Sequence, residues 1–174
     1  MTNTKVTAED LPLLERRRIE AGVLVPLIRA FQAKFGEEVV NQLVSETIVE
    51  IARAGGAEQR ERSNVQTVAD MRSRFGTSGP ISEGSLIVDL VPGDEAHFGF
   101  NVTTCRFVEM YESMGARDLG HLLSCGRDFA SFAAMAPNLQ FDRTQTRMQG
   151  ASHCDFRYSS AAAADSSASS ERPT

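Results

Sequence analysis

The hydrophobic pattern of this chain changes its period near residue 76, and this change limits the folds that the chain can adopt. Before residue 76, apolar residues recur every three or four positions, most clearly over residues 37–54, which indicates amphipathic helices. After it, apolar and polar residues alternate over residues 86–91 and 98–103, which is typical of strands. Continued by further helices and a second pair of strands, this order predicts an α+β domain with a small antiparallel sheet.

Glycine and proline residues mark the expected ends of the elements. Asp10 is a suitable N-cap for the first helix, and Pro26 is expected to bend it. Gly55-Gly56 is expected to end the helix that begins at residue 37. The expected helices cover residues 10–36, 37–54, 57–75, 104–114 and 117–135. The expected strands pair as two hairpins into a four-stranded sheet and cover residues 86–91, 98–103, 139–148 and 153–158.

A chain of 174 residues suits one domain, which we expect to span residues 9–158. Its helical part is residues 9–76, and residues 77–158 hold the sheet and the site. We expect residues 1–8 to be flexible. Residues 159–174 are rich in Ser and Ala and are predicted to be a disordered tail.

Composition and charge exclude several classes of function. The net charge of −5 is opposite to the basic surface that a general nucleic-acid binder or an anionic membrane surface requires. The longest apolar run, residues 22–28, is too short to span a bilayer, and the polar first ten residues do not resemble a signal peptide. The three cysteines are an odd number and fit a reducing compartment. We therefore expect a cytoplasmic protein that binds a small molecule.

The expected helix over residues 117–135 carries chemically useful side chains on one face. His121, Cys125 and Asp128 follow spacings of four and three, which place them in one helical stripe. A thiol becomes a nucleophile when a base accepts its proton or its thiolate is stabilised, and His121, one turn away, could do this. Asp128 could orient a base or accept a proton from a substrate nitrogen. A cysteine on a helix is more often buried and inert, and this structural interpretation stays open.

The two C-terminal strands supply further candidates. Alternation along residues 153–158 turns Cys154 toward the core and places His153, Asp155 and Arg157 on the opposite face. Arg143 continues an apolar strand face, so its guanidinium is expected to bind a ligand carboxylate or to pair with an acid such as Asp128.

Cys105 opens the expected helix over residues 104–114, where the helix dipole would acidify its thiol. It is a second candidate nucleophile or a small apolar cap residue. A zinc site formed by His121, Cys125 and Cys154 is conceivable, but the usual paired ligand spacings are missing. We therefore expect no metal and no cofactor. The chain has no phosphate-binding loop, dinucleotide fingerprint or G-x-S-x-G motif.

Taken together, the motifs of residues 105–158 resemble the L-2-amino-thiazoline-4-carboxylic acid hydrolase family. The resemblance rests on Cys-Gly-Arg-Asp-Phe at 125–129, on Phe-Asp-Arg-Thr-Gln-Thr at 141–146, and on Cys-Asp-Phe-Arg at 154–157. Cys105, Tyr111, Gly115 and Gly150 also match. The resemblance covers about a third of the chain, and the N-terminal helices match only in helical character. It implies hydrolytic opening of a small, cyclic amidine-like ring that carries a carboxylate, by attack at the C=N carbon and loss of a C–N or C–S bond.

Roles in such a reaction follow from the chemistry of the candidates. Cys125 would attack the ring carbon, while Asp128, His153 or His121 would transfer protons. Arg143 and Arg157 would hold the substrate carboxylate. Cys105 and Cys154 would line the pocket, either one being the fallback nucleophile, and Thr144 and Asp155 are also expected to bind the substrate. Two alternatives from other classes are a small-ligand-binding domain without catalysis and a thiol redox sensor. The apolar N-terminal helices could also form a homo-oligomer.

Overall fold

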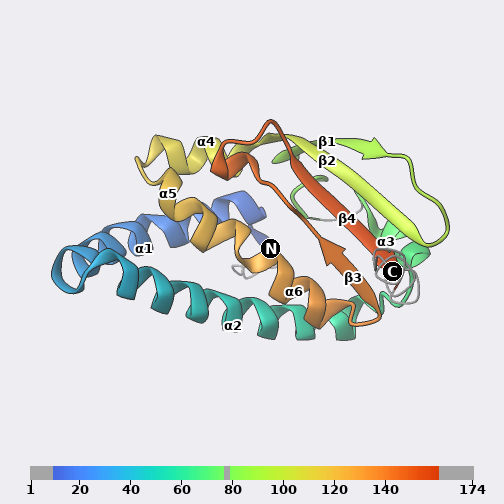
Figure 1. Ribbon diagram of the computed structural model, residues 1–174, viewed down its shortest axis with the longest axis horizontal. Helices are drawn as coiled ribbons and strands as arrows, with labels where there is room; N and C mark the ends of the chain where they lie inside the picture. The colour runs from blue at the N-terminus through green and yellow to red at the C-terminus, as the bar shows by residue number, and fades with distance from the viewer. Residues whose placement is uncertain (1–9, 77–78, 161–174) are drawn as a thin grey trace, which may run out of the picture.

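The computed structural model describes residues 10–76 and 79–160 (Figure 1). The predicted α+β class is confirmed. The predicted flexible residues 1–8, and residues 161–174 of the predicted tail, lie outside the described residues. The elements in chain order are α1 (Leu13–Phe35), α2 (Glu37–Ser63), α3 (Val68–Arg74), β1 (Leu86–Val91), β2 (His97–Cys105), α4 (Arg106–Ser113), α5 (Arg117–Gly120), the π-helical turn η2 (His121–Cys125), α6 (Arg127–Met135), β3 (Leu139–Asp142), the 3-10 turn η3 (Arg147–Gln149) and β4 (Cys154–Ser160).

The four strands form one antiparallel sheet, as predicted, and their order is β1-β2-β4-β3. Strand β4 lies between β2 and β3, so Val102 is paired with Cys154 and Asp142 with Arg157. One face of the sheet is apolar and packs against α3 and α6. Figure 1 shows α6 between this sheet and α2. The molecule is therefore layered, with the long helices on the side of α6 away from the sheet.

Helix α2 does not end at Gly55-Gly56 but continues to Ser63, so the predicted stop is wrong. Gly56 is buried against α6, where a Cβ atom would lie 2.9 Å from the carbonyl carbon of Ser131. The glycine thus permits close packing of two helices. Because α2 is longer than expected, the next helix begins only at Val68, after a capping box formed by Thr67 and Asp70.

Helix α1 begins after Pro12, not after Asp10, and Pro26 lies within it. Strand β2 includes Thr104 and Cys105, which were predicted to be helical. The strand predicted over residues 139–148 ends at Asp142, and β4 extends to Ser160. None of the helices in residues 10–76 and 79–160 has the length and apolarity of a membrane span.

The helix predicted over residues 117–135 is interrupted by the turn η2. There the N–H of Gly126 donates to the carbonyl oxygen of His121 at 2.7 Å, a bond that spans five residues. Such a turn adds one residue to the helical repeat and shifts the side chains that follow it. The predicted stripe of His121, Cys125 and Asp128 is therefore not a regular helical face.

The buried residues form two clusters, and the candidate site lies where they meet. One cluster joins α1, α2, α4 and η2, with Tyr111, Met110, Leu119 and Leu123 at its centre. The other lies between the sheet and the helices α3 and α6. Cys105 packs against both clusters, Cys125 against the first and Cys154 within the second.

Candidate functional site

Three free thiols from three elements gather at the junction of the two clusters. Cys105 ends β2, Cys125 ends η2, and Cys154 begins β4. They lie close enough that a charge on Cys105 or Cys154 would raise the pKa of Cys125. The fold thus brings together three cysteines that are widely separated in the sequence.

Burial dominates the ionisation of these thiols. It strongly raises the pKa of Cys125, and the negative charge of Asp128 raises it further. Burial also raises the pKa of Cys105, against hydrogen bonds from Val108 and Phe107, so the predicted acidification of this thiol is wrong. The pKa of Cys154 is raised in the same way, although the backbone N–H of Arg147 donates to its sulfur at 3.2 Å. A nucleophilic thiol here would need a base to take its proton.

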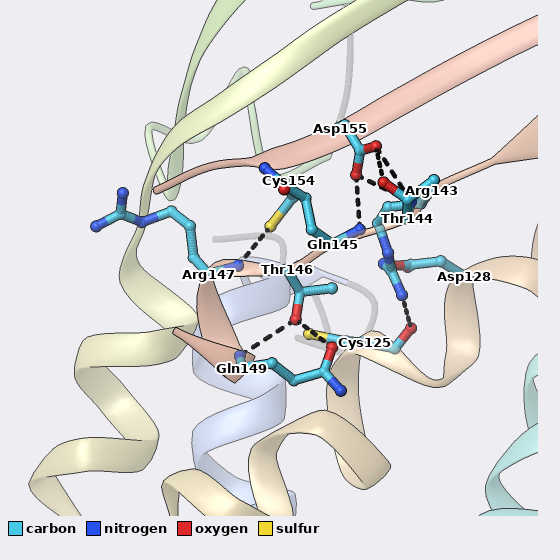
Figure 2. Close-up of polar contacts among 10 residues, drawn as sticks. All are labelled: Cys125, Asp128, Arg143, Thr144, Gln145, Thr146, Arg147, Gln149, Cys154 and Asp155. Carbon is cyan, nitrogen blue, oxygen red and sulfur yellow. Dashed lines mark hydrogen bonds and ion pairs between the residues drawn. The ribbon is translucent and has the colours of Figure 1, made fainter. Parts of the chain in front are cut away.

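An ion pair between Asp128 of α6 and Arg143, which follows β3, stands beside the thiols (Figure 2). The guanidinium also donates to the carbonyl oxygen of Cys125 at 3.1 Å. Its central carbon lies 5.3 Å from the ring of Phe129 and 5.5 Å from the ring of Phe156. The prediction that Arg143 would pair with an acid such as Asp128 is confirmed, and this side chain acts as a support for Asp128 and Cys125.

The two partners differ in their access to solvent. Only 4% of the Arg143 side chain is exposed, whereas Asp128 keeps 37%. Desolvation by the surrounding protein nonetheless raises the pKa of Asp128 above that of an ordinary carboxyl, and the charge of Arg143 opposes this shift. Asp128 is therefore an accessible acid that a small molecule could reach, with a pKa moved toward the range useful for proton transfer.

A second charged group borders Asp128 and was missed by the sequence reasoning. Arg17 of α1 donates to both carboxylate oxygens of Glu20 at 2.7 and 2.8 Å. Arg127 of α6 lies 3.5 Å from the same carboxylate. Burial lowers the pKa of Arg127 and the nearby charge of Arg17 lowers it further, so these two cations share one acid. Both also lower the pKa of Asp128, which places them at its side of the site.

The segment between β3 and η3 is held by Asp155. Its carboxylate accepts hydrogen bonds from the N–H groups of Thr144 at 3.0 Å and Gln145 at 2.8 Å, and from the Thr144 hydroxyl at 2.6 Å. Burial opposes ionisation of Asp155, but these hydrogen bonds outweigh it and lower its pKa. Figure 2 shows this carboxylate on the far side of the segment from Cys125. Asp155 and Thr144 thus shape the segment that carries Arg143.

His153 and Arg157 lie away from the thiols. The ring nitrogens of His153 lie 3.2 Å from the Gln145 side-chain nitrogen and 3.0 Å from the Ser152 hydroxyl. Arg157 donates to the carbonyl oxygens of Phe100 and Phe156 at 3.0 and 2.9 Å and to Asn101 at 2.8 Å. It covers the sheet face opposite to that of Arg143, so the two arginines cannot hold one carboxylate together.

His121 lines a surface depression of about 460 Å³ together with Arg117, Met148 and Gln149. Its buried Nδ1 has no hydrogen-bond partner within the described residues. Burial lowers the pKa of His121, and the charge of Arg143 adds to this effect. The imidazole is therefore neutral near pH 7 and able to accept a proton.

Metal binding gains no support from the arrangement. In residues 10–76 and 79–160, no group of three or more His, Cys, Asp or Glu side chains is placed to hold a metal ion. The mixed zinc site of His121, Cys125 and Cys154 considered above is not formed there.

Comparisons with known proteins place this chain in a family. Among solved structures, the phenol-responsive sensory domain of the transcription activator PoxR, with phenol, aligns with a TM-score of 0.48 and 11% identity, over 91% of this chain and 82% of that chain. No curated protein matches the sequence significantly. The sequence profile of the L-2-amino-thiazoline-4-carboxylic acid hydrolase family matches residues 16–158, which include the thiols, the Asp128–Arg143 pair and the Arg17–Arg127 group, and the chain belongs to this family.

Proposed function

We propose that this protein is a hydrolase that opens a small cyclic C–N substrate bearing a carboxylate. The observation that carries the proposal is the partly exposed Asp128 carboxylate, fixed by a buried Arg143 that also binds the carbonyl of Cys125. A titratable group with a raised pKa, held rigidly beside a thiol, is typical of a catalytic site. The family membership supports a hydrolase. The free thiols fit a reducing compartment, and we expect the protein to act in the cytoplasm.

In the proposed reaction Cys125 is the nucleophile and Asp128 its base. Burial raises the pKa of Asp128, which makes its carboxylate a stronger base toward the thiol. Burial also raises the pKa of Cys125, so this thiol stays protonated until Asp128 takes its proton during attack. The sulfur adds to the electrophilic ring carbon while the ring nitrogen takes a proton. The ring C–N or C–S bond then breaks, and the leaving atom is protonated.

The substrate carbon is now bonded to the Cys125 sulfur. A water molecule adds to this carbon, the bond to Cys125 breaks, and the sulfur recovers its proton. The net reaction consumes one water and releases the opened product. His121, which is neutral near pH 7, is the second candidate for the proton transfers, and His153 is the third.

To bind the substrate carboxylate, the site needs positively charged side chains that the protein's own acids do not fully neutralise. We assign this role to Arg17 and Arg127, because they share Glu20 and their positive charges partly oppose the rise in the pKa of Asp128. An anion between them would relieve their mutual repulsion, and arginine is well suited to bind carboxylates. Arg143 keeps a positioning role. Thr144, Asp155, Cys105 and Cys154 support the walls of the site.

The test is turnover of a panel of thiazoline, hydantoin-like and lactam rings by the purified chain. Cys125→Ala and Asp128→Asn should each lower kcat by roughly three orders of magnitude, as loss of a nucleophile or its base does elsewhere. Cys154→Ser is the matched thiol control and should keep most of the activity. Full activity in Cys125→Ala would remove this residue as the nucleophile.

A second candidate function is binding of a small acid without turnover, or sensing of oxidants. It is favoured by one observation, namely that burial raises the pKa of all three thiols, which disfavours the reactive thiolate. A binder predicts saturable ligand binding with no product. A sensor predicts a reversible disulfide between two of the three cysteines under mild oxidant, visible as a mobility shift.

A further inference from the structure

Helix α1 presents a large uncharged face to solvent. Ile19, Val23, Leu27 and Phe31 follow one another at spacings of four, and between 44% and 66% of each residue is exposed. The exposed positions beside this row are Gly22, Pro26 and Ala30. Soluble domains rarely expose contiguous apolar surface of this kind unless it binds a partner.

Charged residues are excluded from this face. Between residues 19 and 31 the only charged residues are Glu20 and Arg29. Glu20 is paired with Arg17, and Arg29 donates to Asp118 at 2.6 Å. Both side chains are thus held in ion pairs although they are 41% and 40% exposed, and the row from Ile19 to Phe31 is apolar over more than three turns.

We propose that this face of α1 is the interface of a homodimer. Side chains four residues apart form ridges, and the ridges of two helices interlock when each fits beside a row of smaller side chains on its partner. Here the ridge from Ile19 to Phe31 runs next to the small residues Gly22 and Ala30 on the same helix. A Cβ added at Gly22 would meet no atom within 4 Å, so this row is open. The surface is self-complementary, as a two-fold interface requires.

The order of charges selects an antiparallel pairing. The exposed Arg18 precedes the apolar ridge, and the exposed Glu37 and Glu38 follow α1 at its other end. Antiparallel α1 helices that cross near Leu27 bring Arg18 of each copy toward Glu37 and Glu38 of the other. A parallel pair would place the two copies of these glutamates together, which is unfavourable.

The occupant is a second copy because the rest of the chain offers no alternative cover. Outside the described residues, the only apolar side chains larger than alanine are Met1, Val6 and Pro173. Residues 161–174 are mostly Ala and Ser. Val39 and Leu43 at the start of α2 are also exposed, each at 63%.

The test is the molar mass of the full chain in solution over a wide range of concentration. We expect twice the chain mass of 19.0 kDa. Leu27→Glu and Val23→Glu, both at exposed positions, should raise the dimer dissociation constant roughly tenfold or more while the circular dichroism spectrum stays unchanged. Leu90→Glu, at a leucine on β1 that is about as exposed as Val23, should leave the dimer intact. A wild-type chain that remains at 19.0 kDa at every concentration would overturn the proposal.

Crosslinking tests the geometry separately. Leu27→Cys should form an intermolecular disulfide under mild oxidation, because the antiparallel crossing brings the two copies of residue 27 together. Phe35→Cys should not, since it lies eight residues, or about 12 Å, along each helix from the crossing point. The wild-type chain, with its three native thiols, is the control under the same oxidant. Crosslinking of Phe35→Cys without Leu27→Cys would contradict an antiparallel interface.

Discussion

The two adjacent glycines of α2 give a sharp test of how α6, and therefore Asp128, is positioned. A Cβ at Gly56 would overlap the carbonyl oxygen of Ser131 and lie 3.0 Å from the Cβ of Ala134, whereas a Cβ at Gly55 meets nothing within 4 Å. In either position alanine gains about 0.8–1 kcal/mol of helix propensity. At Gly56 this gain is opposed by overpacking, which typically costs about 1–3 kcal/mol.

Since the atoms nearest to Gly56 belong to the backbone of α6, they cannot move aside by a rotamer change, and the cost should lie at the upper end. We therefore expect Gly55→Ala to stabilise the fold by up to about 1 kcal/mol and Gly56→Ala to destabilise it by about 2 kcal/mol. Urea unfolding followed by circular dichroism measures both. Gly56→Ala should also lower activity, because Ser131 is one turn from Asp128. Equal effects of the two substitutions would refute the close packing of α2 on α6.

Three further predictions concern charged groups. Asp155→Ala leaves the N–H groups of Thr144 and Gln145 without their acceptor and should cost about 1–2 kcal/mol in urea unfolding, whereas Asp142→Ala, at a carboxylate that holds no such segment, should cost less. The pKa of Asp128 is raised, and its carboxylate must be ionised to act as the base. Activity should therefore fall with decreasing pH, with an apparent pKa above the ordinary carboxyl value of about 3.9. An apparent pKa at or below that value would argue against Asp128 as the base. The hydrogen bond from Arg29 lowers the pKa of Asp118, so this pair stabilises the fold above the unfolded pKa of Asp118, and the contribution disappears as pH falls through its folded pKa. Because the pair is exposed, Asp118→Asn should lower the free energy of unfolding by no more than about 0.5 kcal/mol at pH 7, and it should have no effect at pH 2. An equal loss of stability at both pH values would exclude an ionic origin.

The fold class was predictable because it depends on periodicity, which local sequence carries. The end of α2 was not, since a glycine pair that stops an isolated helix can instead serve tertiary packing, and only the position of α6 distinguishes the two. The π-helical turn at His121–Cys125 was equally hidden. It is stabilised by its surroundings, and the residue pattern remains compatible with a continuous helix.

In the candidate site, too, some contacts could be predicted from the sequence and others could not. The pairing of Arg143 with Asp128 could be predicted, because an arginine that continues an apolar strand face needs an acid. The Arg17–Arg127 group could not, since α1 and α6 are distant in sequence and nothing local relates them. Strand alternation was enough to place Arg157 and Cys154 on opposite faces of the sheet. It could not place Arg143 relative to these two residues, because that depends on the order of β3 and β4 in the sheet.

The proposal that this protein is a cysteine-dependent ring-opening hydrolase is tested most directly by mass spectrometry of the intact chain during incubation with each ring of the thiazoline, hydantoin-like and lactam panel. The mechanism predicts a substrate-derived adduct on Cys125 that forms and decays in the wild type. This adduct should be absent from the Cys125→Ala variant, which should also form no product. Product formed at an undiminished rate by Cys125→Ala, with no adduct on any cysteine of the wild type, would contradict the mechanism. Ligand binding with no product in the wild type would contradict the enzymatic function itself.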